Sequence, residues 1–338
     1  MPPVNGVMEA GDWPDFPVRY GKAKEIALYM LLKTLTFLVL TLSIACGAES
    51  LKRPYKYSEE LVKKAESGDV EAQNDLGVCY TEGLGVQRNY TEAVNWFQKA
   101  VDQGSDRGKN NLGTSYKNGE GVEQNQTKAF KLYLEAAKNG YEKAQINTGL
   151  CYQDGFGVRQ NYAEAFQWFQ KAAEKNNAWA LNRLGHFYWQ GSGVDKDEDK
   201  AFEMFLKAAK LGNRNAQNTL GWFYYHGMAP ENEKSNDPRK PRYRKKDFQK
   251  AFEWTLKSAE NGLRDAQYNL GIFYWRGEGT QVDLEKARFW MGKAAEGGDR
   301  KAKEVLGWIT LNQNTDKLID GWFALGDDSK KESSTNPQ

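Results

Sequence analysis

A glycine returns every 36 residues along most of this chain of 338 residues. One interval is 50 residues long, so 14 extra residues are inserted into that repeat. A constant period of this length is typical of supersecondary units stacked in a row, each burying its apolar face against its neighbours. The chain is therefore expected to form a solenoid. The recurring glycines are Gly77, Gly113, Gly149, Gly185, Gly221, Gly271 and Gly307.

Each period has the pattern of two helices. Leu76 and Tyr80 lie four residues apart and share one helix face. The segment 83–86, Gly-Leu-Gly-Val, then interrupts the helix, because glycine readily takes the positive φ of a helix end. Asn89 is placed to cap a second helix. The apolar stripe of that helix is Ala93, Phe97, Ala100 and Val101. The fold is predicted to be all-α, with about fourteen helices.

The third period shows the repeated residues almost completely. They are Gly149, Tyr152, Gly155, Gly157, Val158, Ala165, Trp168 and Lys171-Ala172-Ala173. This pattern resembles the Sel-like (Sel-one) repeat, a relative of the tetratricopeptide repeat. The resemblance implies a right-handed superhelical solenoid of antiparallel helix pairs that acts as an adaptor or scaffold. It covers residues 57–312 in about six 36-residue repeats.

Half-repeats are expected at both ends of this region. Residues 57–68 have the pattern of a lone second helix, and residues 301–312 that of a lone first helix. Residues 313–338 are predicted to form a C-terminal cap and a polar tail. The tryptophans that recur on the second helices are interpreted as core residues. They are Trp96, Trp168, Trp254 and Trp290.

The N-terminus has the features of a processed segment. Lys33 precedes an uncharged run over 34–45 that ends in small residues, which is typical of a secretory signal peptide over 30–48 and too short for a membrane span. Residues 1–29 are polar and contain four prolines, and we expect them to be a non-native extension ahead of a start at Met30. The mature chain is predicted to reach the periplasm or cell envelope.

Cys46 follows small residues, as in a bacterial lipobox, and is a candidate for lipidation. Cleavage after Ala45 or Ala48 is the alternative. A lipid at Cys46 would be the chain's only contact with a membrane. Cys79 and Cys151 are two periods apart, at about 20 Å, which is too far for a disulfide. They are expected to be small buried side chains.

No catalytic, metal or cofactor motif is found. The two histidines, His186 and His226, lack zinc-like spacing, and Ser-x-x-Lys, Gly-x-Ser-x-Gly and phosphate-loop patterns are missing. The formal net charge of +2 argues against nucleic-acid binding. Some cysteine-rich relatives of the resembled family have been linked to β-lactam binding, but their paired cysteines are missing here. The sequence predicts a protein that is not an enzyme and has no cofactor.

A binding surface is predicted from helix phase. Positions three before, one after and four after the repeat glycine lie opposite the core side of the first helix, the face that lines the concave groove in tetratricopeptide-like superhelices. Asparagines there would bind a peptide backbone or a sugar, and aromatics would be anchors. Packing of these side chains into adjacent layers is the alternative. The predicted partner-binding residues are Asn182, His186, Trp189, Asn218, Trp222, Tyr225, His226, Trp275 and Arg276.

The 14-residue insertion lies within 228–246, a segment that contains seven basic residues and three prolines. It could grip an anionic polymer or membrane surface, or be a solvated loop balanced by its own Glu231, Glu233 and Asp237.

The predicted function is that of a non-catalytic extracytoplasmic scaffold that binds a protein or peptide in its groove. The alternative is a cell-envelope glycan-binding or cell-wall-modifying protein, including a β-lactam-binding relative.

Overall fold

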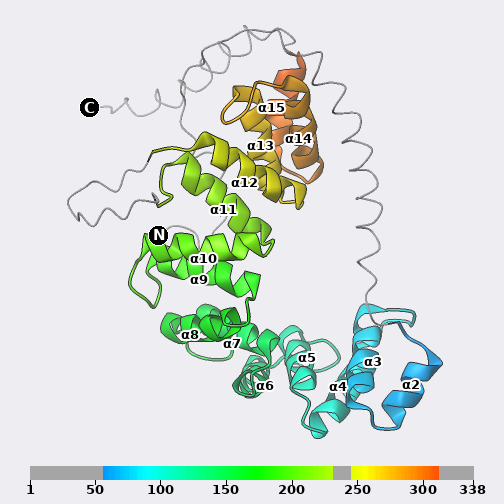
Figure 1. The fold of residues 1–338 in the computed structure, drawn as a ribbon. Helices are drawn as coiled ribbons and strands as arrows, with labels where there is room; N and C mark the ends of the chain where they lie inside the picture. The colour runs from blue at the N-terminus through cyan, green and yellow to red at the C-terminus, as the bar shows by residue number, and fades with distance from the viewer. Residues whose placement is uncertain (1–55, 231–244, 312–338) are drawn as a thin grey trace, which may run out of the picture. The chain divides into compact units, whose positions relative to one another are not determined.

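The computed structural model describes residues 56–230 and 245–311, and these residues form fourteen α-helices and no strand (Figure 1). The described residues fall into two compact units, 56–175 and 176–311. We call them the N-terminal and the C-terminal unit. The predictions for residues 1–29, the signal peptide over 30–48, Cys46, most of the insertion and the tail over 313–338 lie outside the described residues.

The N-terminal unit contains one lone helix and three helix pairs. The lone helix is α2 (Glu59–Glu66), and the pairs are α3 (Val70–Glu82) with α4 (Tyr90–Asp102), α5 (Asp106–Asn118) with α6 (Gln126–Lys138), and α7 (Glu142–Asp154) with α8 (Tyr162–Ala173). Consecutive helices pack against one another throughout this unit. The lone second helix predicted over 57–68 is therefore confirmed.

The C-terminal unit contains three further pairs and a lone first helix. The pairs are α9 (Ala178–Gln190) with α10 (Glu198–Lys210), α11 (Arg214–Tyr225) with α12 (Phe248–Glu260), and α13 (Arg264–Arg276) with α14 (Leu284–Glu296); α15 (Arg300–Leu311) follows alone. The predicted all-α solenoid of six helix pairs with a half-repeat at each end is confirmed.

The recurring glycine is needed where the two helices of a pair meet. A Cβ on Gly149 would lie 2.6 Å from a ring carbon of Phe169 on α8, and one on Gly77 would lie 2.4 Å from Phe97 on α4. Where the ring is replaced, another side chain takes its place: Thr255 faces Gly221 and Met291 faces Gly271. Each glycine thus allows a side chain of the second helix to lie directly on the backbone of the first.

The Gly-x-Gly turns that follow α5, α7 and α13 join successive layers. Gly155 ends α7 in the left-handed conformation, and Gly157 lies against the backbone at Gln126, the first residue of α6 in the preceding layer. A Cβ on Gly157 would be 2.1 Å from the carbonyl oxygen of Gln126. The same contact recurs between Gly121 and Tyr90 at the start of α4, and between Gly279 and Phe248 at the start of α12.

Polar side chains recur at the helix ends. The predicted cap is confirmed, since the Asn89 side chain accepts a hydrogen bond from the Glu92 N–H at 3.2 Å. The residues that cap the six second helices are Asn89, Asn125, Asn161, Asp197, Asp247 and Asp283. Gln73 Nε2 donates to the carbonyl oxygen of Ala65 at the end of α2, and Gln217 Nε2 repeats this contact with Ala209 of α10. These two bonds tie α3 and α11 to the helix before each of them.

Three of the four repeated tryptophans are buried as predicted, and each of the four lies beneath a lysine three residues further along the same helix. Trp96, Trp168 and Trp290 are buried, while Trp254 is partly exposed. The distance from the lysine Nζ to the centre of the ring is 3.7 Å for Lys99 and Trp96 and 4.0 Å for Lys171 and Trp168. It is 4.4 Å for Lys257 and Trp254 and 4.9 Å for Lys293 and Trp290. The lysines cover the outer edge of the rings through cation–π contacts, so these rings are part of the fold.

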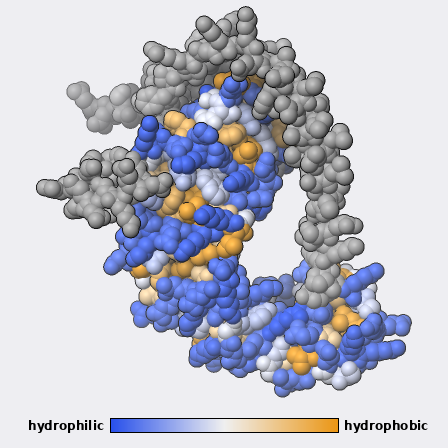
Figure 2. Space-filling view, viewed as in Figure 1, coloured by the Kyte–Doolittle hydropathy of each residue, from blue (hydrophilic) through white to orange (hydrophobic). Residues whose placement is uncertain are grey.

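Cys79 and Cys151 are free and buried, as expected of small core side chains. Burial raises the pKa of the Cys151 thiol to about 11, which leaves it protonated and unreactive at neutral pH. Over the face shown in Figure 2, hydrophobic residues form separate patches among hydrophilic ones. The large hydrophobic side chains that are exposed in the described residues are Leu211, Val282 and Phe289.

Candidate interaction surface

Two pairs of asparagines on the first helices are hydrogen-bonded across layers. Asn147 Nδ2 of α7 donates to Asn110 Oδ1 of α5 at 2.8 Å, and Asn269 Nδ2 of α13 donates to Asn218 Oδ1 of α11 at 3.4 Å. Asn182 of α9 is buried. The expectation that Asn182 exposes its amide to a partner is therefore wrong, and the Asn218 oxygen is already engaged. Neighbouring first helices cover this part of the face, which the phase argument treated as open.

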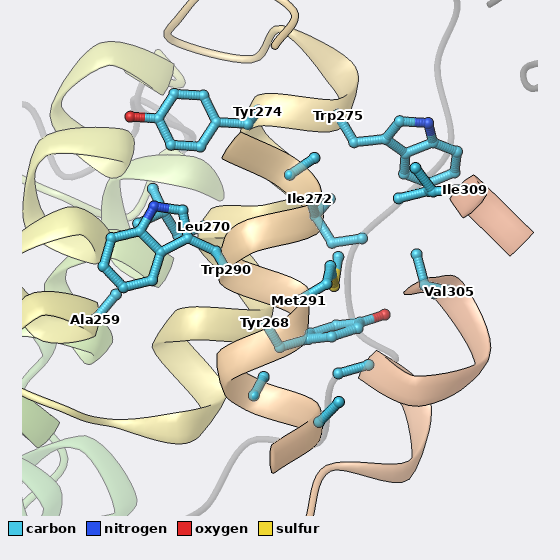
Figure 3. Close-up of a cluster of buried hydrophobic side chains, with 14 of the residues drawn as sticks. Ala259, Tyr268, Leu270, Ile272, Tyr274, Trp275, Trp290, Met291, Val305 and Ile309 are labelled. Atoms are coloured by element: carbon cyan, nitrogen blue, oxygen red, sulfur yellow. The ribbon is translucent and has the colours of Figure 1, made fainter. Parts of the chain in front are cut away.

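Two of the predicted aromatic anchors are also core residues. Trp275 is 8% exposed and points from α13 toward Ile309 of α15, with its ring edge-on to Trp308 at 5.9 Å (Figure 3). Tyr225 is 2% exposed and lies between Phe248 and Phe273. The expectation that these two rings are exposed is wrong, because each fills the space between consecutive layers.

The remaining aromatic candidates form a connected group in the C-terminal unit. His186 and Trp189 of α9, Trp222 of α11, and His226 directly after α11 are all partly exposed. Ring centres are 6.4 Å apart for His186 and Trp189, 5.4 Å for Trp189 and Trp222, and 4.5 Å for Trp222 and His226. We call these four residues the aromatic cluster. It joins two successive first helices on the face that the phase argument selected.

Two polar atoms of the aromatic cluster are buried without a hydrogen-bond partner. They are the Nδ1 of His186 and the Nε1 of Trp222. A buried donor or acceptor left without a partner costs about 1–3 kcal/mol, so most such groups in proteins are paired. The repeated tryptophans of the second helices differ from this cluster, because each of them contacts a lysine. The aromatic cluster therefore carries unused hydrogen-bonding capacity beside partly exposed rings.

His186 is held in its neutral form. Burial is the main cause that lowers the pKa of His186 from 6.5 to about 4, and the positive charge of Arg183 lowers it further. Its ring is also edge-on to Phe205 at 4.9 Å, which fixes the imidazole against the second helix of the pair. At physiological pH the side chain offers one N–H donor and one acceptor.

We expect His186 to make stability depend on pH. The unfolded chain, in which histidine titrates near 6.5, binds the proton before the folded chain does. The stabilisation is complete above about pH 6.5 and is lost as the pH falls toward about 4, with an upper limit of about 3 kcal/mol. Urea unfolding of the wild type and of His186→Phe at pH 7.5 and pH 5 measures it, and the variant should show the smaller loss.

The chain has only two histidines, which makes a direct check simple. An NMR titration of the imidazole C–H signals should show one midpoint near 4, and this signal should vanish in His186→Phe. A midpoint near 6.5 for the signal that vanishes would contradict the burial of His186.

A partly buried glutamate that the sequence did not indicate lies beside Tyr225. The Tyr225 hydroxyl donates to Glu278 Oε1 at 3.3 Å. Burial raises the pKa of Glu278, while the nearby positive charges of Arg276 and Lys246 oppose that shift. Glu278 is the middle residue of a Gly-x-Gly turn, a position where the repeats carry Leu84, Glu120, Phe156 and Ser192. Because this position has no common residue type, the repeat pattern could not single it out.

The insertion leaves the repeat junction intact. The Asp247 N–H donates to the carbonyl oxygen of Tyr224 at 3.0 Å, as the Asn161 N–H does to Tyr152 at 2.8 Å in an ordinary repeat. Most of the basic residues of the insertion lie outside the described residues, so its predicted roles stay predictions. Lys246 is described, and its Nζ lies 5.6 Å from the centre of the Tyr225 ring.

Within residues 56–230 and 245–311, no group of three or more His, Cys, Asp or Glu residues could hold a metal ion. No helix within the same ranges is both long and apolar enough to cross a membrane.

A family model describes most of the repeats. The Sel1 repeat matches residues 70–105, 107–141, 142–177, 180–213, 242–263 and 264–299, together more than half of the chain. The chain belongs to the Sel1 repeat family. Proteins with Sel1 repeats are generally non-catalytic helical scaffolds for protein–protein interaction. The matches leave out residues 214–241, and with them all of α11, which carries Trp222.

Two solved Sel1-type structures are similar to this chain. A Sel1 repeat protein from Oxalobacter formigenes is 34% identical, with a TM-score of 0.58, over 67% of this chain and 85% of that one. The antigen c5321 of uropathogenic Escherichia coli, which has an SLR fold, is 33% identical with a TM-score of 0.60, over 80% of this chain and 56% of that one.

A curated relative is similar over a much shorter stretch. DAP3-binding cell death enhancer 1 of Rattus norvegicus is 41% identical over 58 residues. These make up 16% of this chain and 11% of the rat protein.

Proposed function

We propose that this Sel1 repeat protein is a non-catalytic extracytoplasmic scaffold that binds a protein or peptide segment at the aromatic cluster. The observation that carries the proposal is the buried Nε1 of Trp222 and Nδ1 of His186, which have no hydrogen-bond partner among the described residues, beside the paired rings of Trp189 and Trp222. Rings with one polar atom are the side chains most often used as interface anchors.

The contacts of four other first-helix residues support this choice of place. Asn110 and Asn218 have their amide oxygens bonded to asparagines of the next layer, and Tyr225 and Trp275 are buried between layers. These positions therefore have little left to offer a partner. The aromatic cluster combines partial exposure, rings and unused polar atoms in one place.

A displayed library of random 12-residue peptides tests the binding function on the full chain. We expect selection of peptides that bind saturably, and we expect Trp189→Ala to weaken them by about tenfold or more. The matched control is Trp254→Ala, which removes a partly exposed tryptophan of a second helix. Saturable binding to purified cell-wall polysaccharide, with no peptide selected, would instead favour the glycan-binding alternative.

The extracytoplasmic location is a separate part of the proposal. It is supported by Lys33 and the uncharged run over 34–45. Residues 30–56 fused to alkaline phosphatase should give active enzyme, since that enzyme needs the disulfides of an oxidising compartment. Labelling with radioactive palmitate, compared between the wild type and Cys46→Ala, tests the lipid anchor. An inactive fusion would contradict export.

A further inference from the structure

We propose that the segment bound at the aromatic cluster is acidic and places a carboxylate at Trp222. This inference rests on the proposed function, because it names the chemistry of the partner at the same surface. It is carried by two independent observations, the kind of hydrogen-bonding atom that the cluster leaves unused and the charge of the residues around it.

The first observation concerns hydrogen bonding. The indole Nε1–H of Trp222 is a donor and never an acceptor, and it is buried without a partner in the part of the chain that the structure describes. Whatever satisfies it must supply an acceptor oxygen. Lysine and arginine side chains have only donors and cannot do so. A hydrogen bond to a charged acceptor is roughly twice as strong as one between neutral groups, so a carboxylate satisfies this donor best.

The second observation concerns charge. The charge of Arg183 of α9 acts on His186 of the cluster. The charge of Arg276 of α13 acts on the neighbouring Tyr225 and Glu278, and that of Lys246, just before α12, acts on Glu278. These side chains come from three different segments of the C-terminal unit. The carboxyl group among them, Glu278, accepts the hydrogen bond of Tyr225. Among the charged groups that act on His186, Tyr225 and Glu278, these three cations outnumber the one carboxyl group, although the whole chain is nearly neutral at +2.

These two observations also argue against a basic partner. Tryptophan rings attract cations through their faces, so Trp189 and Trp222 taken alone would accept a lysine or arginine of the partner. Three nearby cations oppose that arrangement, since bringing like charges together at an interface costs several kcal/mol. A basic peptide would also leave the Trp222 donor unsatisfied.

Three pools of fluorescein-labelled ten-residue peptides test the inference by anisotropy on the full chain. The pools share all neutral positions and carry at four fixed positions either Asp and Glu, or Asn and Gln, or Lys and Arg. We expect the acidic pool to bind at least about tenfold more tightly than the amide pool. This preference should shrink as salt is raised from 50 to 500 mM, because salt screens partly exposed charges.

Trp222→Phe separates the hydrogen bond from the ring. It keeps an aromatic side chain and removes the Nε1–H, and we expect it to weaken the acidic pool by about tenfold or more. Trp254→Phe is the matched control and should bind as the wild type does. The thermal midpoints of both variants, measured by circular dichroism, show whether each is folded at the temperature of the titration.

The outcomes separate the two proposals. Equal or tighter binding of the amide or basic pool, or unchanged acidic binding by Trp222→Phe, overturns the acidic partner and leaves peptide binding in place. If neither the pools nor the 12-residue library bind the wild type, the proposed function falls and this inference falls with it.

Discussion

Replacing Gly157 by alanine is expected to destabilise the N-terminal unit by about 3 kcal/mol or more. Two costs add at this residue. Its φ is +68°, which an L-residue adopts only at a cost of about 1–2 kcal/mol. A Cβ would also lie 2.1 Å from the carbonyl oxygen of Gln126, so the turn after α7 would have to move off the start of α6. Urea unfolding followed by circular dichroism measures the loss.

Gly155→Ala is the control, because it lies in the same turn. Its φ of +72° is similar, but a Cβ there would come no closer than 3.4 Å, to a side-chain carbon of Gln160. We expect this change to cost only the conformational part, about 1–2 kcal/mol. If the two variants lose equal stability, the contact between the turn and the preceding layer has no energetic role.

Phe169→Ala is expected to lower the free energy of unfolding by about 3–5 kcal/mol. The Phe169 ring is 0% exposed and lies on the backbone of α7 at Gly149. Its removal leaves a cavity at the closest point between the two helices of a pair. Because helix α7 has no side chain at Gly149 to fill that space, little relaxation is expected. Thermal and urea unfolding measure the change.

Phe289→Ala is the matched control for this substitution. Phe289 is 54% exposed on α14, where it contacts Trp290 edge-on and Lys293. We expect a loss of no more than about 0.5–1 kcal/mol. A loss at Phe169 as small as that at Phe289 would show that the glycine–ring contact is not part of the core.

The fold could be predicted because its determinants are local and repeated. The turn glycines, the cap at Asn89 and the apolar stripe each lie within a few residues of the helix end or face that they define. Because the pattern occurs six times, the fold could be predicted even though single repeats depart from it. One departure is Thr255, which faces Gly221 where most other repeats have an aromatic ring. The insertion did not obscure the fold, because Asp247 still makes the junction hydrogen bond of the repeat.

The candidate surface could be predicted only in part, because exposure depends on neighbouring layers. Helix phase separates the core side of one helix from its opposite side, and it selected His186, Trp189 and Trp222 on that basis. Helix phase alone does not determine how closely the first helix of the next layer approaches. Tyr225 and Trp275 share a phase with Trp189, yet both are buried between layers.

The asparagine contacts show which sequence signal was overlooked. Asn110 and Asn218 are each followed one repeat later by an asparagine displaced by one residue, Asn147 and Asn269. Thr219 stands at the corresponding position for Asn182, so no amide partner is available there. Comparing adjacent positions between successive repeats would have indicated that these amides pair with each other.

The central claim, that the aromatic cluster is a binding surface and not core, is tested most directly by measuring stability and binding on the same two variants. Trp222→Ala should weaken the tightest peptide from the library by about 2 kcal/mol or more and lower stability by less than about 1.5 kcal/mol. Trp168→Ala, which removes a ring that is 7% exposed, should cost about 3–5 kcal/mol of stability and leave binding by the folded fraction unchanged. If Trp222→Ala loses as much stability as Trp168→Ala and its folded fraction binds normally, the aromatic cluster is core and the claim is wrong.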